Sequence, residues 1–206
     1  MKKIVLLVLA LSILQTLAYC QEKKDSIKTA LLIVDIQYFY FPSEGSAGLV
    51  GVEQASLKAK ELLEIARANE LLVVHVKHKS NKLSEIHKNV EPIENEKVII
   101  KEEVNSFLKT DLLEYLKTNQ INRLLVIGMQ THMCLEAAVR AAHDFGFECI
   151  TIEDACATRD LKFGDKLVKA EDIHAGVLAT LSGGGYSKIL NLSQFKENIH
   201  KYLFEK

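Results

Sequence analysis

Short apolar runs alternate with amphipathic stretches along most of the chain, and this alternation restricts the fold more than any other feature. Residues 30–34 are apolar throughout, as expected for a strand buried on both faces of a sheet. Further strand-like segments occupy 71–76, 97–100, 123–127, 147–152 and 186–190, and helical patterns occupy 52–68, 111–116, 134–145 and 172–181. Apolar strands separated by helices form parallel sheets with helices on both faces. The sequence therefore predicts a three-layer α/β/α fold with a mostly parallel sheet of about six strands.

The first residues have the layout of a secretory signal. A basic start at Lys2 is followed by the apolar run 4–14, and charged residues begin at Glu22. This run is too short to form a comfortable transmembrane helix. A buried first strand or helix is the alternative, and the polar segment before the next apolar run argues against it. We therefore expect an exported protein, periplasmic or secreted, with no stable membrane span after the signal is cleaved.

The expected organisation is a signal peptide (1–20), a linker (21–28) and one folded domain (29–206). Lipid attachment at Cys20 is disfavoured, because Tyr19 is bulkier than the small residue that usually precedes a lipidated cysteine. The 206 residues are 48% hydrophobic and 26% charged, which fits a single domain with a sizeable core. The formal net charge of -1 gives no electrostatic footprint for nucleic acid or an anionic membrane.

The cysteines of the expected mature domain differ in their sequence context. Cys149 falls in an expected strand and Cys156 just after it, which favours small core residues over a disulfide. Cys134 instead begins an expected helix after the fourth strand. Free N–H groups at a helix start favour a thiolate and can hold an oxyanion. Cys134 is therefore a candidate nucleophile, with a buried structural cysteine as the alternative.

Two further reactive residues follow strands of the same expected sheet. Asp35 follows the first strand and Lys101 the third, and the carboxyl ends of parallel strands share the edge where ligands bind. Asp35 would act as general base towards Cys134, and Lys101 would lower the pKa of the thiol. Taken alone, each residue also has an ordinary interpretation: Asp35 as an aspartate that caps a loop, and Lys101 as a solvated surface lysine. The shared edge favours a catalytic set.

Four ordered segments carry a resemblance to a known family. They are 30–37, 96–107, 128–142 and 154–158. From about residue 29 to about residue 190, the chain resembles the isochorismatase-like superfamily of cysteine hydrolases. The resemblance implies a triad of Asp35, Lys101 and Cys134. It also implies a cis peptide between Met129 and Gln130, with the N–H groups of Gln130 and Cys134 forming an oxyanion hole.

The resemblance also narrows the chemistry. True isochorismatases lack the cysteine, so Cys134 argues for hydrolysis of an amide-type C–N bond in a small molecule, through a thioester. Metal-binding relatives carry an Asp-x-His pair that this chain lacks, and His75 and His78 should face opposite sides of a strand. We predict no catalytic metal and no cofactor, which places the chain in the metal-free amidase branch.

Five residues are expected in the substrate pocket, namely Gln37, Phe39, His78, Phe107 and His132. The loops 79–94 and 158–170 should shape the pocket further, and His174 is expected to pack structurally. Relatives form homo-oligomers, so the resemblance implies a dimer or larger assembly. Two other functions stay open: a catalytically silent binding protein of the same fold, and a thiol redox enzyme. The redox enzyme is the weaker alternative, because the sequence has no Cys-x-x-Cys pair.

Overall fold

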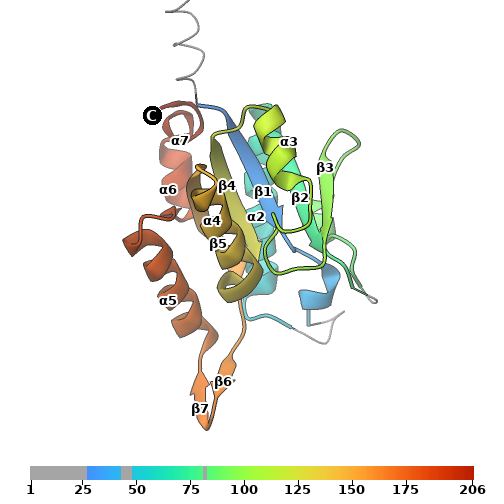
Figure 1. Ribbon diagram of the computed structural model, residues 1–206. Helices are drawn as coiled ribbons and strands as arrows, with labels where there is room; N and C mark the ends of the chain where they lie inside the picture. The colour runs from blue at the N-terminus through green and yellow to red at the C-terminus, as the bar shows by residue number, and fades with distance from the viewer. Residues whose placement is uncertain (1–26, 43–47, 81–82) are drawn as a thin grey trace, which may run out of the picture.

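The computed structural model describes residues 27–42, 48–80 and 83–206 (Figure 1). The expected signal peptide and most of the linker lie outside these residues. Across the described chain, six parallel strands form one sheet in the order β3-β2-β1-β4-β5-β8, which confirms the predicted fold class. The strands are β1 (Thr29–Val34), β2 (Leu72–His78), β3 (Lys97–Lys101), β4 (Arg123–Met129), β5 (Glu148–Ala157) and β8 (Lys188–Leu190).

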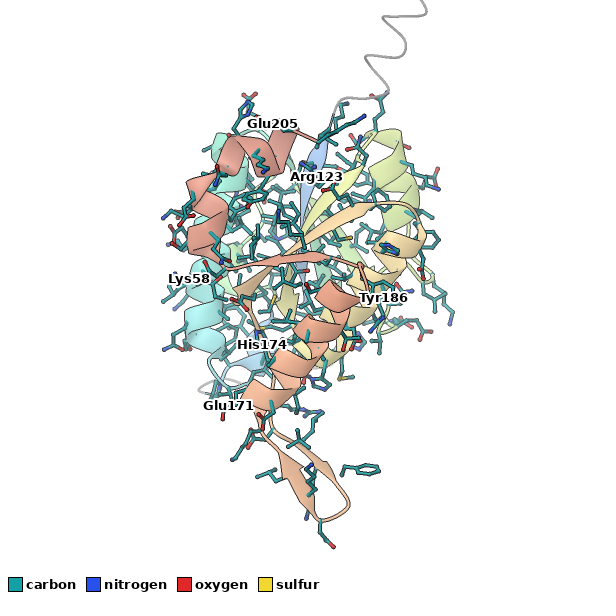
Figure 2. All side chains as sticks on the ribbon, turned by 90° about the vertical axis from the view of Figure 1, so that its left-hand side faces the viewer. Lys58, Arg123, Glu171, His174, Tyr186 and Glu205 are labelled. Carbon is teal, nitrogen blue, oxygen red and sulfur yellow. The ribbon has the colours of Figure 1, made fainter. Side chains whose placement is uncertain are left out.

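Helices cover both faces of the sheet (Figures 1 and 2). One face carries α2 (Val52–Ala68), α6 (Leu192–Glu197) and α7 (Ile199–Phe204), and Lys196 of α6 forms an ion pair with Glu61 of α2. The other face carries α3 (Leu112–Thr118), α4 (Glu136–Asp144) and α5 (Ala170–Gly183). Short helical turns η1 (Tyr38–Tyr40), η2 (Lys88–Val90) and η3 (Thr131–Leu135) lie in the connections.

The central strands end together at one edge of the sheet. Every residue of β1 is buried, because β2 and β4 flank it and helices cover both faces. In this register Val34 of β1 lies opposite Val76 of β2 and Gly128 of β4. Gly128 has a φ of +133°, and a Cβ built there would lie 1.9 Å from the Val34 carbonyl oxygen. Only glycine allows the two strand ends to approach this closely.

The structure departs from the expected elements after β4. The pairing of β4 with β5 shifts register between Val126 and Gly128, and β5 continues to Ala157, so Cys156 lies within the strand and not after it. The expected loop 158–170 contains a hairpin of β6 (Leu161–Phe163) and β7 (Lys166–Val168), which projects away from the body of the protein (Figure 1). None of the described helices combines the length and apolarity needed to span a membrane.

Candidate active site

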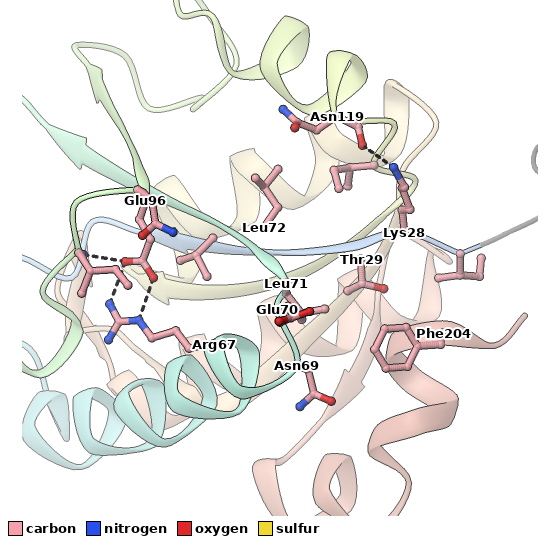
Figure 3. A pocket seen from close by; sticks show the side chains of 15 residues that line it. Lys28, Thr29, Arg67, Asn69, Glu70, Leu71, Leu72, Glu96, Asn119 and Phe204 are labelled. Atoms are coloured by element: carbon pink, nitrogen blue, oxygen red, sulfur yellow. Dashed lines mark hydrogen bonds and ion pairs between the residues drawn. The ribbon is translucent and has the colours of Figure 1, made fainter.

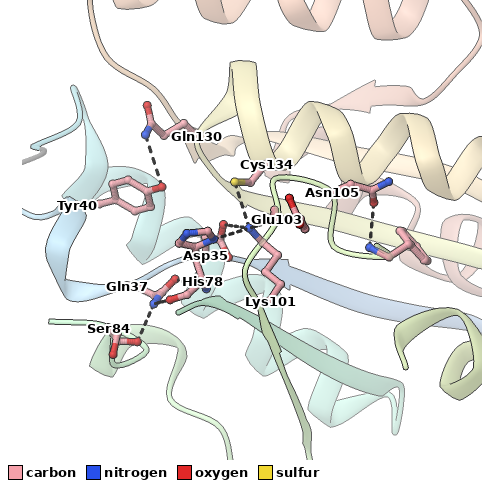
Figure 4. Close-up of polar contacts among 11 residues, drawn as sticks. Asp35, Gln37, Tyr40, His78, Ser84, Lys101, Glu103, Asn105, Gln130 and Cys134 are labelled. Atoms are coloured by element: carbon pink, nitrogen blue, oxygen red, sulfur yellow. Dashed lines mark hydrogen bonds and ion pairs between the residues drawn. The ribbon is translucent and has the colours of Figure 1, made fainter. Parts of the chain in front are cut away.

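Four neighbouring strands deliver polar side chains to the carboxyl edge of the sheet (Figure 4). Asp35 follows β1, His78 ends β2, Lys101 ends β3, and Cys134 lies in η3 after β4. Because β3 is two strands away from β1, the Lys101 side chain must cross the end of β2 to reach Asp35. It is 1% exposed, so its alkyl chain is buried along that path. The predicted triad residues therefore meet.

The Lys101 ammonium group is the centre of these contacts. Its Nζ lies 2.8 Å from Asp35 Oδ2 and 3.2 Å from Cys134 Sγ. It also donates to the Glu103 carbonyl oxygen at 3.0 Å and lies 3.4 Å from His78 Nδ1. The Lys101 ammonium thus contacts both the Asp35 carboxyl group and the Cys134 thiol, in a site from which water is largely excluded.

The two acids bind their protons more tightly than in water. Burial raises the pKa of Asp35 above its usual value of 3.8, and Lys101 opposes that effect. Burial, with the Asp35 charge adding to it, raises the pKa of Cys134 to about 12, again opposed by Lys101. This differs from the sequence expectation of a thiolate at a helix start, because burial outweighs the cation. The resting site holds a thiol beside a carboxyl group.

Local backbone geometry aims Asp35 into the site. Its φ is +52°, in the left-handed region that residues with a Cβ rarely adopt. Its N–H continues the sheet by donating to the Val76 carbonyl oxygen at 2.9 Å. After Ile36 and Gln37 the chain enters the short helical turn η1. Such a residue, held in place by its neighbours, is characteristic of functional positions.

Cys134 lies in a tight turn after β4. The peptide bond between Met129 and Gln130 is cis, as the resemblance implied. Cys134 belongs to the π-helical turn η3, and α4 begins at Glu136, two residues later than expected. The turn is closed by the N–H groups of Met133 and Leu135, which both donate to the Gln130 carbonyl oxygen. The oxyanion hole of Gln130 and Cys134 stays a prediction.

Two histidine–threonine pairs fix this turn from the sides. Thr131 Oγ1 lies 2.9 Å from Nδ1 of His174 on α5, and His132 Nδ1 lies 2.5 Å from Thr158 Oγ1 at the end of β5. Burial lowers the pKa of both histidines. His174 was expected only to pack; in the structure it ties α5 (Figure 2) to the residues that carry Cys134.

The other residues expected in the substrate pocket differ in whether their contacts reach the triad. The buried Gln37 amide donates to the carbonyl oxygens of His78 and Ser84 and accepts from the His78 N–H, which supports the end of β2. Phe39 packs on Tyr40 with ring centroids 4.2 Å apart. Phe107 packs on Phe145, beyond the end of α4 that is far from Cys134. His78 lies beside the triad, through its contact with Lys101.

Tyr40 is a neighbour of the triad that the sequence did not single out. It is buried, and its hydroxyl accepts a hydrogen bond from Gln130 Nε2 at 3.5 Å. Burial raises the pKa of Tyr40 most, and the charges of Asp35 and Cys134 raise it further. The aromatic run 38–41 gives no periodic signal that distinguishes Tyr40 from Tyr38, because the turn η1 decides which ring faces inward.

A second buried charge cluster lies near the amino-terminal end of β3 (Figure 3). Arg67 of α2 donates to both Glu96 oxygens at 2.8 Å, and His75 Nε2 lies 2.9 Å from Glu96 Oε2. Arg67 and Glu96 border a hollow of about 650 Å³ that also reaches Lys28 and Thr29 at the start of β1. The hollow is therefore at the opposite edge from Cys134. Within the described ranges, no three His, Cys, Asp or Glu side chains gather as metal ligands.

Comparison with known proteins identifies the family. Residues 29–180 match the family model described as an isochorismatase domain. The chain is 41% identical over 166 residues to the uncharacterized isochorismatase family protein YddQ of Bacillus subtilis (strain 168), across 75% of this chain and 92% of that protein. It is 30% identical over 141 residues to streptothricin hydrolase of Streptomyces noursei, across 64% of this chain and 55% of that protein.

A solved structure gives the same result in three dimensions. The isochorismatase from Pseudomonas putida KT2440 matches with a TM-score of 0.77 and 30% identity, over 81% of this chain and 89% of that one. The chain belongs to the isochorismatase-like superfamily of hydrolases.

Proposed function

We propose that the protein is a cysteine hydrolase that cleaves an amide-type C–N bond of a small molecule through a thioester on Cys134. The observation that carries this proposal is the position of Lys101 Nζ, 2.8 Å from Asp35 and 3.2 Å from Cys134. One buried cation between a carboxyl group and a thiol allows a proton to pass between the two acids while the net charge stays constant.

The first step is attack of Cys134 on the substrate carbonyl carbon. Asp35 takes the thiol proton as the C–S bond forms, and Lys101 stabilises whichever acid carries the negative charge. The carbonyl oxygen becomes an oxyanion, which the N–H groups of Gln130 and Cys134 would hold. Because the thiol is protonated at rest, its activation is coupled to the attack itself.

The second half of the reaction returns the proton. Protonated Asp35 gives its proton to the leaving nitrogen as the C–N bond breaks, which leaves a thioester on Cys134 and a carboxylate on Asp35. Water then attacks the thioester, Asp35 accepts a proton from that water, and the acid product departs as the thiol reforms. A nitrogen leaving group needs this proton, whereas a good oxygen leaving group does not, so Asp35 supports C–N cleavage.

The test uses p-nitrophenyl acetate, an activated acyl donor, and intact-protein mass spectrometry. We expect a burst of p-nitrophenol and one acetyl group on Cys134, both lost in Cys134→Ala. Cys149→Ala is the matched control, because Cys149 is also a buried free thiol but lies in β5, away from the triad. Retention of the burst in Cys134→Ala would exclude the mechanism. Absence of acylation in the parent protein would favour the silent binding protein.

Export and self-association are also proposed. The basic start and apolar run of residues 1–20 support export, and N-terminal sequencing of the protein from its native host would test it. Light scattering of the purified protein would test for a dimer or larger assembly. A protein that keeps residues 1–20, or a monomer at all concentrations, would contradict the respective proposal.

A further inference from the structure

The Gln130 side chain has unused hydrogen-bonding capacity beside the nucleophile. Gln130 is 5% exposed, and its Nε2 donates to the Tyr40 hydroxyl at 3.5 Å. Its Oε1 is buried and has no hydrogen-bond partner within the described part of the chain. A buried amide oxygen that has lost water without gaining a donor is unfavourable, and such atoms in native proteins call for an explanation.

The position of Gln130 suggests which molecule supplies the missing donor. Gln130 directly precedes the turn η3, which contains Cys134, and Figure 4 shows it with Tyr40 on one side of Cys134, while Asn105 lies on the other. The Tyr40 hydroxyl feels the charges of both Asp35 and Cys134. The Tyr40–Gln130 pair therefore lies close to Asp35 and Cys134, where Asp35 must meet the leaving nitrogen.

The groups around this space are rich in oxygen acceptors. Asp35 contributes a carboxyl group, Tyr40 a hydroxyl and Gln130 an amide oxygen, whereas the Lys101 ammonium is already shared among Asp35, Cys134 and the Glu103 carbonyl. A nitrogen that carries several N–H bonds would satisfy such acceptors, and an ester oxygen or a fully substituted nitrogen would leave them unpaired.

We propose that Gln130 Oε1, held in place by Tyr40, accepts an N–H of the leaving nitrogen, so that the site selects primary carboxamides and releases ammonia. This inference rests on the proposed thioester mechanism and assigns its leaving group. Gln130 then has two roles: its main-chain N–H faces the oxyanion, and its side chain recognises the nitrogen.

The reverse of the acylation step provides a test that needs no knowledge of the natural substrate. Cys134 is acetylated with p-nitrophenyl acetate, and the thioester is divided between water and hydroxylamine. When hydroxylamine attacks, a C–N bond forms, the C–S bond breaks, and the amine proton passes through Asp35 to the departing sulfur. The products are acetohydroxamate and the free thiol; water gives acetate. Methanol, which has no N–H, gives methyl acetate.

The product ratio is measured in the parent protein and in Gln130→Met and Tyr40→Phe. Both products come from one acyl-enzyme, so the ratio does not depend on how fast each variant is acylated. We expect the hydroxamate-to-acetate ratio to fall about tenfold in Gln130→Met, the equivalent of about 1.4 kcal/mol. Tyr40→Phe should give a smaller fall of about threefold, because Gln130 loses its support but keeps its oxygen. The methyl acetate-to-acetate ratio should change by less than about twofold.

The outcomes separate this inference from the mechanism on which it rests. If the acyl-enzyme forms and Gln130→Met leaves the hydroxamate ratio unchanged, the role of Gln130 is overturned while the thioester mechanism stands. If hydroxylamine and methanol ratios fall equally, Gln130 shapes the site without recognising nitrogen, and the inference is again overturned. If the parent protein forms no acyl-enzyme, the mechanism and the inference fail together.

Discussion

The two buried charge clusters differ in how completely their hydrogen bonds are met. Beside the start of β3, the Glu96 carboxylate accepts from Arg67, from His75 and from the Ile93 N–H. At the carboxyl edge, Asp35 has Lys101 at 2.8 Å, and within the described residues no backbone N–H donates to it.

The difference determines what each carboxyl group can do. Burial raises the pKa of Glu96, but the hydrogen bonds from Arg67, Ile93 and His75 outweigh it and hold the pKa at about 2. For Asp35 burial dominates, and the pKa is raised. A carboxylate whose oxygens accept several hydrogen bonds stays charged and supports the fold. One with few donors can exchange a proton with its neighbour.

Neutralising the buried Asp35–Lys101 pair should give the largest effect. In Asp35→Asn with Lys101→Met, we expect p-nitrophenol release from p-nitrophenyl acetate to fall at least about 10³-fold, because the general base and the cation are both lost. Asparagine tolerates the left-handed backbone at this position. The free energy of unfolding in urea should stay within about 1 kcal/mol or rise, because a buried pair is costly to desolvate. A loss above about 2 kcal/mol would show that the pair mainly holds the fold.

Alkylation of Cys134 would sharpen the contrast at the thiol. A pKa of about 12 instead of 9.0 leaves about 10³-fold less thiolate near neutral pH, so iodoacetamide should react slowly and ever faster from about pH 7 to about pH 10. Lys101→Met should slow the reaction of Cys134 but not that of Cys149, whose pKa is raised by burial and Glu148 without a cation. A plateau near neutral pH would mean that the thiolate exists at rest.

The second cluster should respond in stability and not in activity. We expect Glu96→Gln to lower the free energy of unfolding by about 2 kcal/mol, because Arg67 and His75 lose a shared charged acceptor. Acylation of Cys134 should stay within about twofold of the parent, since distant sites act independently. Glu85→Gln is the control: its pairing with Lys77 is exposed and should contribute under about 0.5 kcal/mol. An activity loss in Glu96→Gln would remove the distinction between the clusters.

The two carboxyl groups should also shift stability with pH in opposite directions, and this is the smallest effect. Glu96 has a lowered pKa, so its contribution is complete above about 4.5 and is lost as the pH falls towards 2. Asp35 has a raised pKa, so its contribution declines as the pH rises above about 3.8. Urea unfolding across this range should show a smaller loss of stability towards acid in Glu96→Gln, and a smaller decline of stability with rising pH in Asp35→Asn, than in the parent protein. Identical pH profiles in both variants and the parent would contradict this assignment.

The sequence predicted the three layers because buried strands and amphipathic helices alternate along it. It predicted that Asp35, Lys101 and Cys134 meet because each lies at or after the end of a strand. Once β1, β3 and β4 are recognised as parallel strands of one sheet, Asp35, Lys101 and Cys134 must lie along one edge. The hairpin of β6 and β7 was missed because its strands are three residues long and Phe163 at its tip is 86% exposed, so no buried run marks it.

Other features depend on contacts between distant segments, which one sequence does not reveal. The contribution of Tyr40 requires its hydroxyl to meet Gln130, ninety residues away in the chain. The sign of the Cys134 pKa shift was missed because a helix start was considered without the burial that outweighs it. The support that Gln37 gives to β2 comes from side-chain hydrogen bonds to the backbone of His78, a distant residue in the chain.

The contact between Gly128 and Val34 has a consequence for evolution. Any side chain at Gly128 would push against the last carbonyl of β1, one residue before Asp35, and would move Asp35 relative to Cys134. In a library of random variants, this position should therefore tolerate change as poorly as Cys134, although it carries no reactive group. Among related proteins, sequence change would therefore have to fall in the projecting hairpin and the loops, while the close contact between the Gly128 and Val34 backbones stays fixed.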